Sequence, residues 1–263
     1  MLVTGGAQRI GRVIALELAR AGWRVAVHYR RSADAAAETV AELRAAGAEA
    51  TAFAADLADE AQCEALMPAV QAQFGRIDAV VNNASLFELD DVPSFGFAAM
   101  ERHWRANTAA PIVLARALHR APAATPAPPG GRVVVNLLDQ KLWNPNPDHL
   151  SYTLSKAALE AANTMLAIAL APAVRVCGVA PGVTLLSGEM NGPEFAASHR
   201  MTPLGRSSTP EDVARAVRFV IESPAITGTT LLVDGGQHLT AQRRDVMFLA
   251  REAAEGAGAG VQR

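Results

Sequence analysis

The chain has 263 residues and a mass of 27.6 kDa, which suffices for one large α/β domain with a substantial core. Basic and acidic residues nearly balance, 24 against 26, so the sequence lacks the excess of positive charge that is typical of a nucleic-acid-binding protein. No apolar run reaches the length of a membrane span, and the N-terminus lacks the charged and apolar regions of a signal peptide. We therefore expect a cytoplasmic protein that has neither nucleic acid nor membrane as a partner.

Cysteine and histidine usage agrees with that expectation. Cys63 and Cys177 lie far apart in predicted core elements, so buried free thiols are expected, as in a reducing compartment. The six histidines show no metal-ligand spacing, so no metal site is predicted.

Strands and helices alternate along the chain. Strands are predicted at Leu2–Thr4, Arg24–Tyr29, Ala50–Ala54, Ala79–Asn82, Arg132–Leu137, Arg175–Val179 and Leu231–Val233. Helices are predicted at Ile10–Ala21, Ala35–Ala46, Glu60–Phe74, Met100–Arg120, Tyr152–Ala171 and Pro210–Ser223. This alternation predicts a single-domain, Rossmann-like α/β fold: a doubly wound, seven-stranded parallel sheet with helices on both faces. Ligands of such sheets bind at the carboxyl ends of the strands.

Two segments fall outside this alternation. Pro122–Gly131 is predicted to be a proline-rich surface loop inside the single domain, which spans residues 1–240. Residues 241–263 form a C-terminal extension with a helix predicted at Arg243–Glu255. Two positions for the extension stay open: packed on a neighbouring subunit, or free as a surface tail.

The first strand runs into a glycine turn, Thr4-Gly5-Gly6-Ala7-Gln8-Arg9-Ile10-Gly11, and a helix follows. Such a turn lets the backbone approach a pyrophosphate, whose charge sits at the positive helix N-terminus. Taken alone, a glycine-rich turn is more often only a tight loop. As candidate cofactor-binding residues it supplies Gly5, Gln8, Arg9 and Ile10.

The end of the second strand bears on the choice of cofactor. NAD sites place Asp or Glu there to accept bonds from the ribose 2′-hydroxyl, whereas this chain reads His28-Tyr29-Arg30-Arg31-Ser32. Two guanidinium groups and a hydroxyl suit a 2′-phosphate. The alternative is a pair of solvated arginines with Ser32 capping the next helix. Their position at the ribose site favours NADP(H).

Tyr152 and Lys156 stand four residues apart on a predicted helix and therefore on one face of it. A nearby cation favours the ionised form of a phenol, so Tyr152 is a candidate proton donor and acceptor. Most Tyr-x-x-x-Lys pairs lie on solvated helix faces. This pair indicates a catalytic role only in combination with the motifs upstream of it. Asp139 lies 13 residues before the tyrosine.

Thr-Gly-x-x-x-x-x-Gly, Asn82-Asn83-Ala84, Tyr152-x-x-x-Lys156 and Pro181-Gly182 resemble, in order and spacing, the short-chain dehydrogenase/reductase family over residues 1–239. The resemblance implies that Lys156 holds the nicotinamide ribose and lowers the pKa of Tyr152, with Asn107 supporting Lys156 through water. It also implies a homotetramer formed through the helices Met100–Arg120 and Tyr152–Ala171. Further cofactor contacts that it implies are Asp56, Leu57, Asn83, Ala84, Pro181, Gly182, Val183 and Thr184.

Three features depart from ordinary members of that family. Asp139 stands where they carry a serine, and a carboxylate accepts hydrogen bonds but donates none. Beside a developing alkoxide it would repel, whereas it suits a substrate rich in N–H groups. Arg9 replaces a glycine at a helix N-terminus, where a cation needs an anion nearby. Ser85 and Phe87 add a hydroxyl and a ring after the fourth strand; alone, Phe87 would be read as core, but rings also hold flat heterocycles.

With these departures the chain resembles the pteridine reductases of that family. The resemblance implies that Arg9 contacts the pyrophosphate and the pterin, Ser85 bonds the pterin and the cofactor, and Phe87 stacks on the pterin. Asp139 and Tyr152 would handle the proton. A mobile lid is expected at residues 184–205, with Leu186 and Met190 as pocket walls. The implied activity is NADPH-dependent reduction of a dihydropterin or dihydrofolate ring.

Two alternatives remain at this point. One is a carbonyl reductase of the same fold, acting for example on a 3-oxoacyl thioester; Asp139 argues against it. The other is a non-catalytic NADP-binding sensor, which would have no use for Tyr152, Lys156 and Asn107. The sequence does not separate dihydrofolate, dihydromonapterin and dihydrobiopterin, because their tails would lie over the lid.

Overall fold

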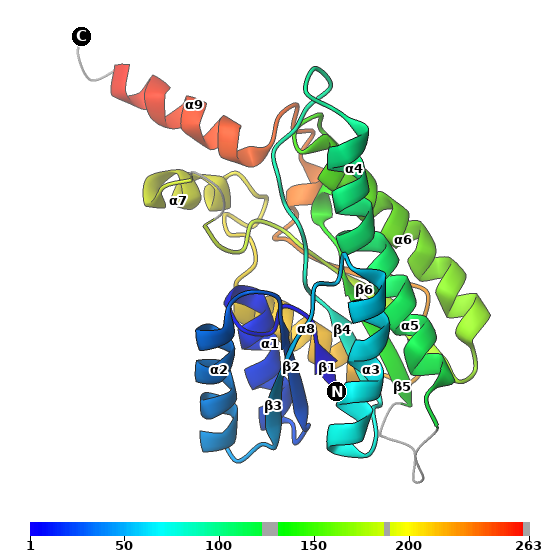
Figure 1. The fold of residues 1–263 in the computed structure, drawn as a ribbon. Helices are drawn as coiled ribbons and strands as arrows, with labels where there is room; N and C mark the ends of the chain where they lie inside the picture. The colour runs from blue at the N-terminus through cyan, green and yellow to red at the C-terminus, as the bar shows by residue number, and fades with distance from the viewer. Residues whose placement is uncertain (123–130, 187–189, 260–263) are drawn as a thin grey trace.

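The computed structural model describes residues 1–122, 131–186 and 190–259, with side chains as far as residue 252. Seven parallel strands form one sheet in the order β3-β2-β1-β4-β5-β6-β7 (Figure 1). The strands are β1 Leu2–Val3, β2 Val25–Tyr29, β3 Ala50–Ala54, β4 Ala79–Asn82, β5 Arg132–Leu137, β6 Val174–Pro181 and β7 Thr230–Val233. The predicted doubly wound, seven-stranded sheet is thereby confirmed.

Helices cover both faces of this sheet (Figure 1). The α-helices are α1 Arg9–Arg20, α2 Ala33–Ala45, α3 Glu60–Phe74, α4 Phe97–His103, α5 Ala110–Arg120, α6 Leu150–Leu170, α7 Gly192–Arg200, α8 Pro210–Glu222 and α9 Val246–Ala259. Among the described residues there are also a π-helical segment, η1 Trp104–Ala109, and two short 3₁₀ turns, η2 Gln140–Leu142 and η3 Gln237–Leu239. None of the described helices is long and apolar enough to cross a lipid bilayer.

Successive residues of the central strands point to opposite faces of the sheet, as the two-residue repeat of a strand requires. Val3 and Val81 pack in the core beneath α1, α2 and α8, whereas Leu2 and Val80 pack in the core beneath α3, α5 and α6. Both faces are therefore apolar, which explains the continuous hydrophobic runs of these strands.

The sheet has its topological switch point between β1 and β4. From β1 the chain winds outward to β2 and β3 on one side, and from β4 to β7 on the other. The connections after β1 and β4 therefore diverge and leave a crevice at the carboxyl ends of these strands. Side chains of Thr4 and Asn83 join the two ends there: the Asn83 amide donates to the carbonyl oxygens of Thr4 and Gly5, at 3.0 and 3.2 Å.

The helix predicted at Met100–Arg120 is interrupted, and this part of the prediction is wrong. The π-helical segment η1 separates α4 from α5, and Pro111 stands in the first turn of α5. Proline has no backbone N–H, so a regular α-helical ladder does not run through this point. The wide turn places Asn107, which is fully buried, against α6.

The region predicted as a lid contains the helix α7, which begins with a capping box formed by Asn191 and Glu194. The C-terminal extension packs on this helix, because α9 lies along α7 (Figure 1). Arg251 of α9 pairs with Glu194 of α7, with 3.2 Å between Nε and Oε1. Of the predicted loop Pro122–Gly131, residues 123–130 lie outside the described residues, as do 187–189 of the lid.

The helix α1 sits directly on the glycine turn. A Cβ atom at Gly11 would lie 2.1 Å from the carbonyl oxygen of Gly5 and 2.5 Å from the amide nitrogen of Asn83. Gly5 itself has φ +60°, a conformation that side chains disfavour. Only glycine at position 11 therefore allows the helix to start this close to the ends of β1 and β4.

We expect Gly11→Ala to reduce the free energy of unfolding by roughly 3 kcal/mol, the upper end for overpacking, because the added methyl group meets backbone atoms. Urea denaturation followed by circular dichroism measures the effect. Gly192→Ala is the matched control, since a Cβ atom at Gly192 meets nothing within 4 Å, and its effect should stay within about 0.5 kcal/mol. Equal stabilities of the two variants would contradict the close approach.

Candidate functional site

Two adjoining pockets lie at the carboxyl ends of the strands, with volumes of about 400 and 290 Å³. They share the residues Arg9, Ile10, Asn83 and Ser85. The first pocket is also lined by the candidates Gly5, Gln8, His28, Tyr29, Arg30, Arg31, Ser32, Asp56, Leu57 and Ala84. The second is also lined by Phe87, Asp139, Tyr152, Lys156, Pro181, Gly182, Val183 and Thr184. The structure thus brings the candidate residues of the glycine turn close to those around Asp139 and Tyr152, although the two sets are far apart in the sequence.

Three candidates do not line either pocket. Leu186 and Met190 lie outside the lining of the second pocket, where Leu185 takes part instead. Asn107 is fully buried behind the loop that carries Ser85. The roles predicted for Leu186 and Met190 as walls stay predictions.

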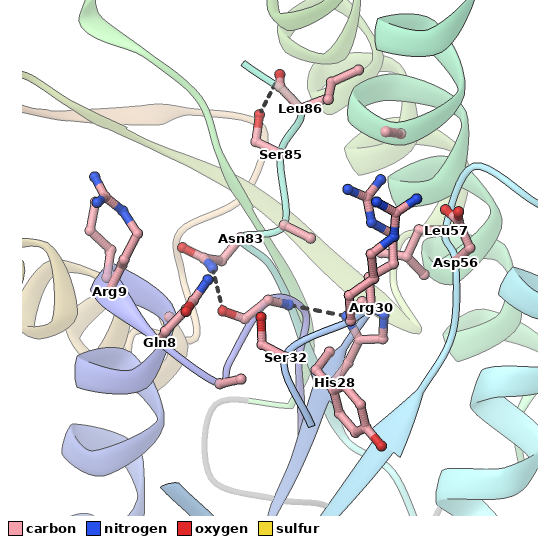
Figure 2. A pocket seen from close by; sticks show the side chains of 18 of the residues that line it. Gln8, Arg9, His28, Arg30, Ser32, Asp56, Leu57, Asn83, Ser85 and Leu86 are labelled. Atoms are coloured by element: carbon pink, nitrogen blue, oxygen red, sulfur yellow. Dashed lines mark hydrogen bonds between the residues drawn. The ribbon is translucent and has the colours of Figure 1, made fainter. Parts of the chain in front are cut away.

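The glycine turn is fixed by a buried histidine. The Nδ1 atom of His28 accepts a hydrogen bond from the amide of Gly5 at 3.1 Å (Figure 2). Its Nε2 atom therefore carries the proton and faces the carbonyl oxygen of Ala55 at 3.0 Å. Burial lowers the pKa of His28, which keeps the ring neutral and this pattern intact. His28 lines the nucleotide-sized pocket, while its ring nitrogens hold the scaffold.

Arg30 and Arg31 give the first pocket its charge. Both are exposed, and neither takes part in an ion pair among the residues that the structure describes. Ser32 occupies the N-cap position of α2, yet its hydroxyl makes no capping bond. With the glycine turn opposite, these groups fit a dinucleotide that bears an extra phosphate on the ribose.

Arg9 stands where the two pockets meet. Figure 2 shows its side chain on the opposite side of the first pocket from Arg30. Its backbone has φ +54°, a left-handed conformation that costs a non-glycine residue about 1 kcal/mol. The guanidinium donates to the carbonyl oxygen of Leu186 at 2.7 Å. Arg9 therefore links the glycine turn to the lid segment.

The second pocket is built around a hydrogen-bonded pair. The hydroxyl of Tyr152 donates to Oδ2 of Asp139 at 2.8 Å, and Oδ1 of Asp139 accepts from the backbone amide of Lys141 at 2.8 Å. Burial raises the pKa of Asp139. Burial, and then the charge of Asp139, raise the pKa of Tyr152 well above its ordinary value. The tyrosine therefore holds its proton near neutral pH.

The expectation that Lys156 lowers the pKa of Tyr152 is wrong for this structure. The ammonium of Lys156 donates to the carbonyl oxygen of Leu137 at 2.7 Å and lies 5.8 Å from the centre of the tyrosine ring. Burial lowers the pKa of Lys156 itself to about 8. Burial of the phenol, followed by the charge of the adjacent Asp139, raises the pKa of Tyr152 instead.

Asn107 braces the loop that carries Ser85. Its amide nitrogen donates to the carbonyl oxygen of Leu86 at 2.9 Å and to the hydroxyl of Ser155 at 3.0 Å. Its amide oxygen accepts from the amide of Leu86 at 2.7 Å and from the hydroxyl of Ser85 at 3.2 Å. All of these bonds go to the loop and to α6, so the support of Lys156 through water stays a prediction.

Phe87 is not a core residue, since 43% of its surface is exposed. One face of its ring stacks on His149, with 4.1 Å between the ring centres and 20° between the planes. Its ring and that of Tyr152 meet edge to face, with centres 4.7 Å apart and planes at 89°. Phe87 also lines the second pocket, beside Tyr152.

Several residues of this site were not predicted from the sequence. Lys141, Gln237, Asp245 and Val246 line the second pocket, and His149 supports Phe87. None belongs to a motif; the only local signal is that Lys141 follows Asp139 by two positions. The described residues hold no cluster of histidine, cysteine or acidic side chains that fits a metal ion.

Comparisons with known proteins agree with this geometry. Ketoacyl reductase 2 of the granaticin polyketide synthase from Streptomyces violaceoruber is 35% identical over 245 residues, which cover 90% of this chain and 95% of that protein. Pteridine reductase 1 from Leishmania tarentolae is 34% identical over an alignment of 278 positions, which covers 91% of this chain and 96% of that protein.

Among solved structures, the FolM alternative dihydrofolate reductase 1 from Brucella canis, complexed with NADP, superposes with a TM-score of 0.84. It is 38% identical, and the match covers 91% of this chain and 93% of that one. A family model described as enoyl-(acyl carrier protein) reductase matches residues 5–238. With this match, the fold and the two pockets, the chain belongs to the short-chain dehydrogenase/reductase family.

Proposed function

We propose that this protein is an NADPH-dependent reductase of a pterin ring, either a dihydropterin or a dihydrofolate. The observation that carries the proposal is the 2.8 Å hydrogen bond from Tyr152 to Asp139 in the second pocket. A carboxylate at this place accepts hydrogen bonds and repels a developing alkoxide, so it favours a substrate that presents N–H groups. Pteridine reductase 1 from Leishmania tarentolae and the Brucella canis dihydrofolate reductase support the same substrate class.

NADP(H) is the proposed cofactor, held in the first pocket. Arg30 and Arg31, which have no acidic partner among the described ion pairs, would bind the 2′-phosphate, and the glycine turn would bind the pyrophosphate. The Brucella canis relative was solved with NADP, which supports this choice. When bound, NADPH supplies the hydride.

The residues of the second pocket would orient the pterin and move one proton. Phe87, which lines the pocket and stacks on His149, would contact the flat ring of the pterin. Tyr152 would give its proton to the ring nitrogen next to the carbon that is reduced, because its raised pKa keeps it protonated until the nitrogen becomes basic. Asp139 would hold the phenol in position and accept a bond from a substrate N–H group.

Carbonyl reduction is the second candidate, and the ketoacyl reductase relative favours it. Tyr152 and Lys156 would serve either reaction, so these residues do not discriminate. The difference rests on Asp139, because reduction of a ketone requires a hydrogen-bond donor beside the oxygen that becomes negative.

A cytoplasmic location is also part of the proposal. Cys63 and Cys177 are free and buried, as expected of a protein from a reducing compartment. Burial raises the pKa of Cys63 to about 11 and raises that of Cys177, so both thiols are unreactive.

We expect Arg31→Asp to raise the KM for NADPH about tenfold or more, since losing a charge-assisted bond costs about 1.5–3 kcal/mol. The KM for NADH should stay unchanged or fall, because the new carboxylate can accept bonds from a ribose hydroxyl. Steady-state kinetics with both cofactors measure this difference. The control is Arg20→Asp, a charge reversal at the far end of α1. Equal weakening of both cofactors would contradict the assignment of Arg31.

We expect Asp139→Ser to lower kcat/KM for dihydrobiopterin by about 10²–10⁴-fold, the usual scale of a positioned acid–base group. For a simple ketone, kcat/KM should rise or stay constant, because a hydroxyl replaces a repelling charge. Tyr152→Phe is the inactive control for both substrates. Pterin turnover that Asp139→Ser leaves unchanged would remove the reason for preferring a pterin.

We propose a homotetramer in which α6 and the α4–α5 region meet their symmetry mates. Met165 and Ile168 of α6 are 62% and 76% exposed, and Phe97 of α4 is 89% exposed, which leaves apolar side chains for an interface.

Sedimentation at micromolar concentration should give the mass of four chains. Met165→Glu combined with Ile168→Glu should give smaller species, because charges would be buried without partners. Val92→Glu, on an exposed loop, is the control. A monomeric unmodified protein would contradict the proposal.

A further inference from the structure

The C-terminal segment that follows η3 forms part of the wall of the second pocket. Asp245 and Val246 line this pocket together with Asp139 and Tyr152, although they lie outside every motif of the family. Val246 is buried and begins α9. The pocket is thus completed by residues more than 90 positions downstream of the reactive pair.

This segment is anchored to the loop between η2 and α6. Nε of Arg244 lies 3.1 and 2.9 Å from the two carboxylate oxygens of Asp148, and the amide of Asp245 donates to the same carboxylate at 2.7 Å. Asn144 accepts from the amide of Gln242 at 3.1 Å. These contacts of Gln242, Arg244 and Asp245 hold the segment in place, so the side chain of Asp245 has a defined position.

Lys141 connects the segment to the reactive pair. Its side chain is only 4% exposed, and its ammonium donates to the carbonyl oxygen of Asp148 at 2.6 Å and to Oδ2 of Asp245 at 3.2 Å. Its backbone amide holds Asp139, which in turn accepts from Tyr152. Tyr152, Asp139, Lys141 and Asp245 therefore form one continuous chain of contacts.

The charges around the pair oppose each other. The negative charge of Asp245 raises the pKa of both Tyr152 and Asp139, whereas the positive charge of Lys141 lowers that of Asp139. The other charged or titratable groups near this cluster include Arg9, Lys156, Asp148, Arg244 and His149. Asp148 and Arg244 pair with each other, and burial lowers the pKa of His149.

We propose that Asp245 and Lys141 are positioning residues of the substrate pocket, which hold Asp139 against Tyr152 through this chain of contacts and act on the pair by their opposite charges. The inference rests on the proposed function in one respect, namely that this pair moves the proton. It goes further in assigning a role to the C-terminal segment. That segment also reaches the lid, since Arg251 pairs with Glu194 of α7.

The variants that test it are Asp245→Asn, Lys141→Met and the double variant, with Glu252→Gln as the matched control. Glu252 is an exposed acid of the same segment. Loss of the Asp245 charge makes proton release easier, so the midpoint of the pH profile of kcat/KM should move to lower pH. Loss of the Lys141 charge should move it to higher pH, and the double variant should lie between them.

We expect shifts of about half a unit to one unit, the usual size of such perturbations in proteins. Lys141→Arg keeps the positive charge and should restore the midpoint. The dissociation constant of NADPH should not change in any of these variants, because neither Lys141 nor Asp245 is among the candidate cofactor contacts. Loss of activity without any shift of the midpoint would mean a merely structural role and would overturn the inference.

A second readout needs no substrate. The chain has two tyrosines, so in a Tyr29→Phe background the ring carbon signals of ¹³C-labelled tyrosine report on Tyr152 alone. Ionisation of Tyr152 should begin at lower pH after Asp245→Asn and at the reference pH after Glu252→Gln. An unchanged onset would overturn the inference. A shifted onset in a protein that does not reduce pterins would overturn the proposed substrate and leave the positioning role in place.

Discussion

The site depends on the close contact between the start of α1 and the glycine turn after β1. Gly11 stands against the carbonyl oxygen of Gly5, and the Asn83 side chain ties this turn to the end of β4. The contact fixes the direction of a helix N-terminus at the switch point of the sheet, where its positive end faces the crevice. Both pockets share Asn83 in their walls, so the relative placement of the two follows from this contact.

Burial decides the chemistry of the second pocket. A tyrosine and a carboxylate in direct contact, both taken out of water, each favour their protonated form, and so the proton stays with the pair. A family member with serine at position 139 would lack this second acid. The family fold serves many reactions, and the substrate class that we propose for this chain depends on one side chain, Asp139, which accepts a hydrogen bond from the hydroxyl of Tyr152.

Two neutral arrangements support the reactive groups. The His28 ring, which burial keeps neutral, accepts from the backbone of the glycine turn, and the Asn107 amide uses all its bonds on the loop of Ser85 and on α6. Neither places an additional net charge near the pockets. The charged side chains that line the pockets are Arg30, Arg31 and Asp56 in the first, Lys156, Asp139, Lys141 and Asp245 in the second, and Arg9 in both.

The sequence by itself determined the sheet, its strands and the family. The apolar pattern of each strand and the glycines that end the helices are local signals, and they recur in one element after another. The sequence also predicted the nucleotide candidates from their places after the carboxyl ends of strands, and Tyr152 and Lys156 from their spacing on one helix. The interruption at η1 was missed because a π-helical turn has the same apolar periodicity as an α-helix over so few residues. The raised pKa of Tyr152 was missed because spacing along a helix shows neither burial nor the carboxylate that approaches from another element. Only the tertiary structure brought in Asp245, 104 residues after Lys141, because contacts between distant segments leave no periodic trace in the sequence.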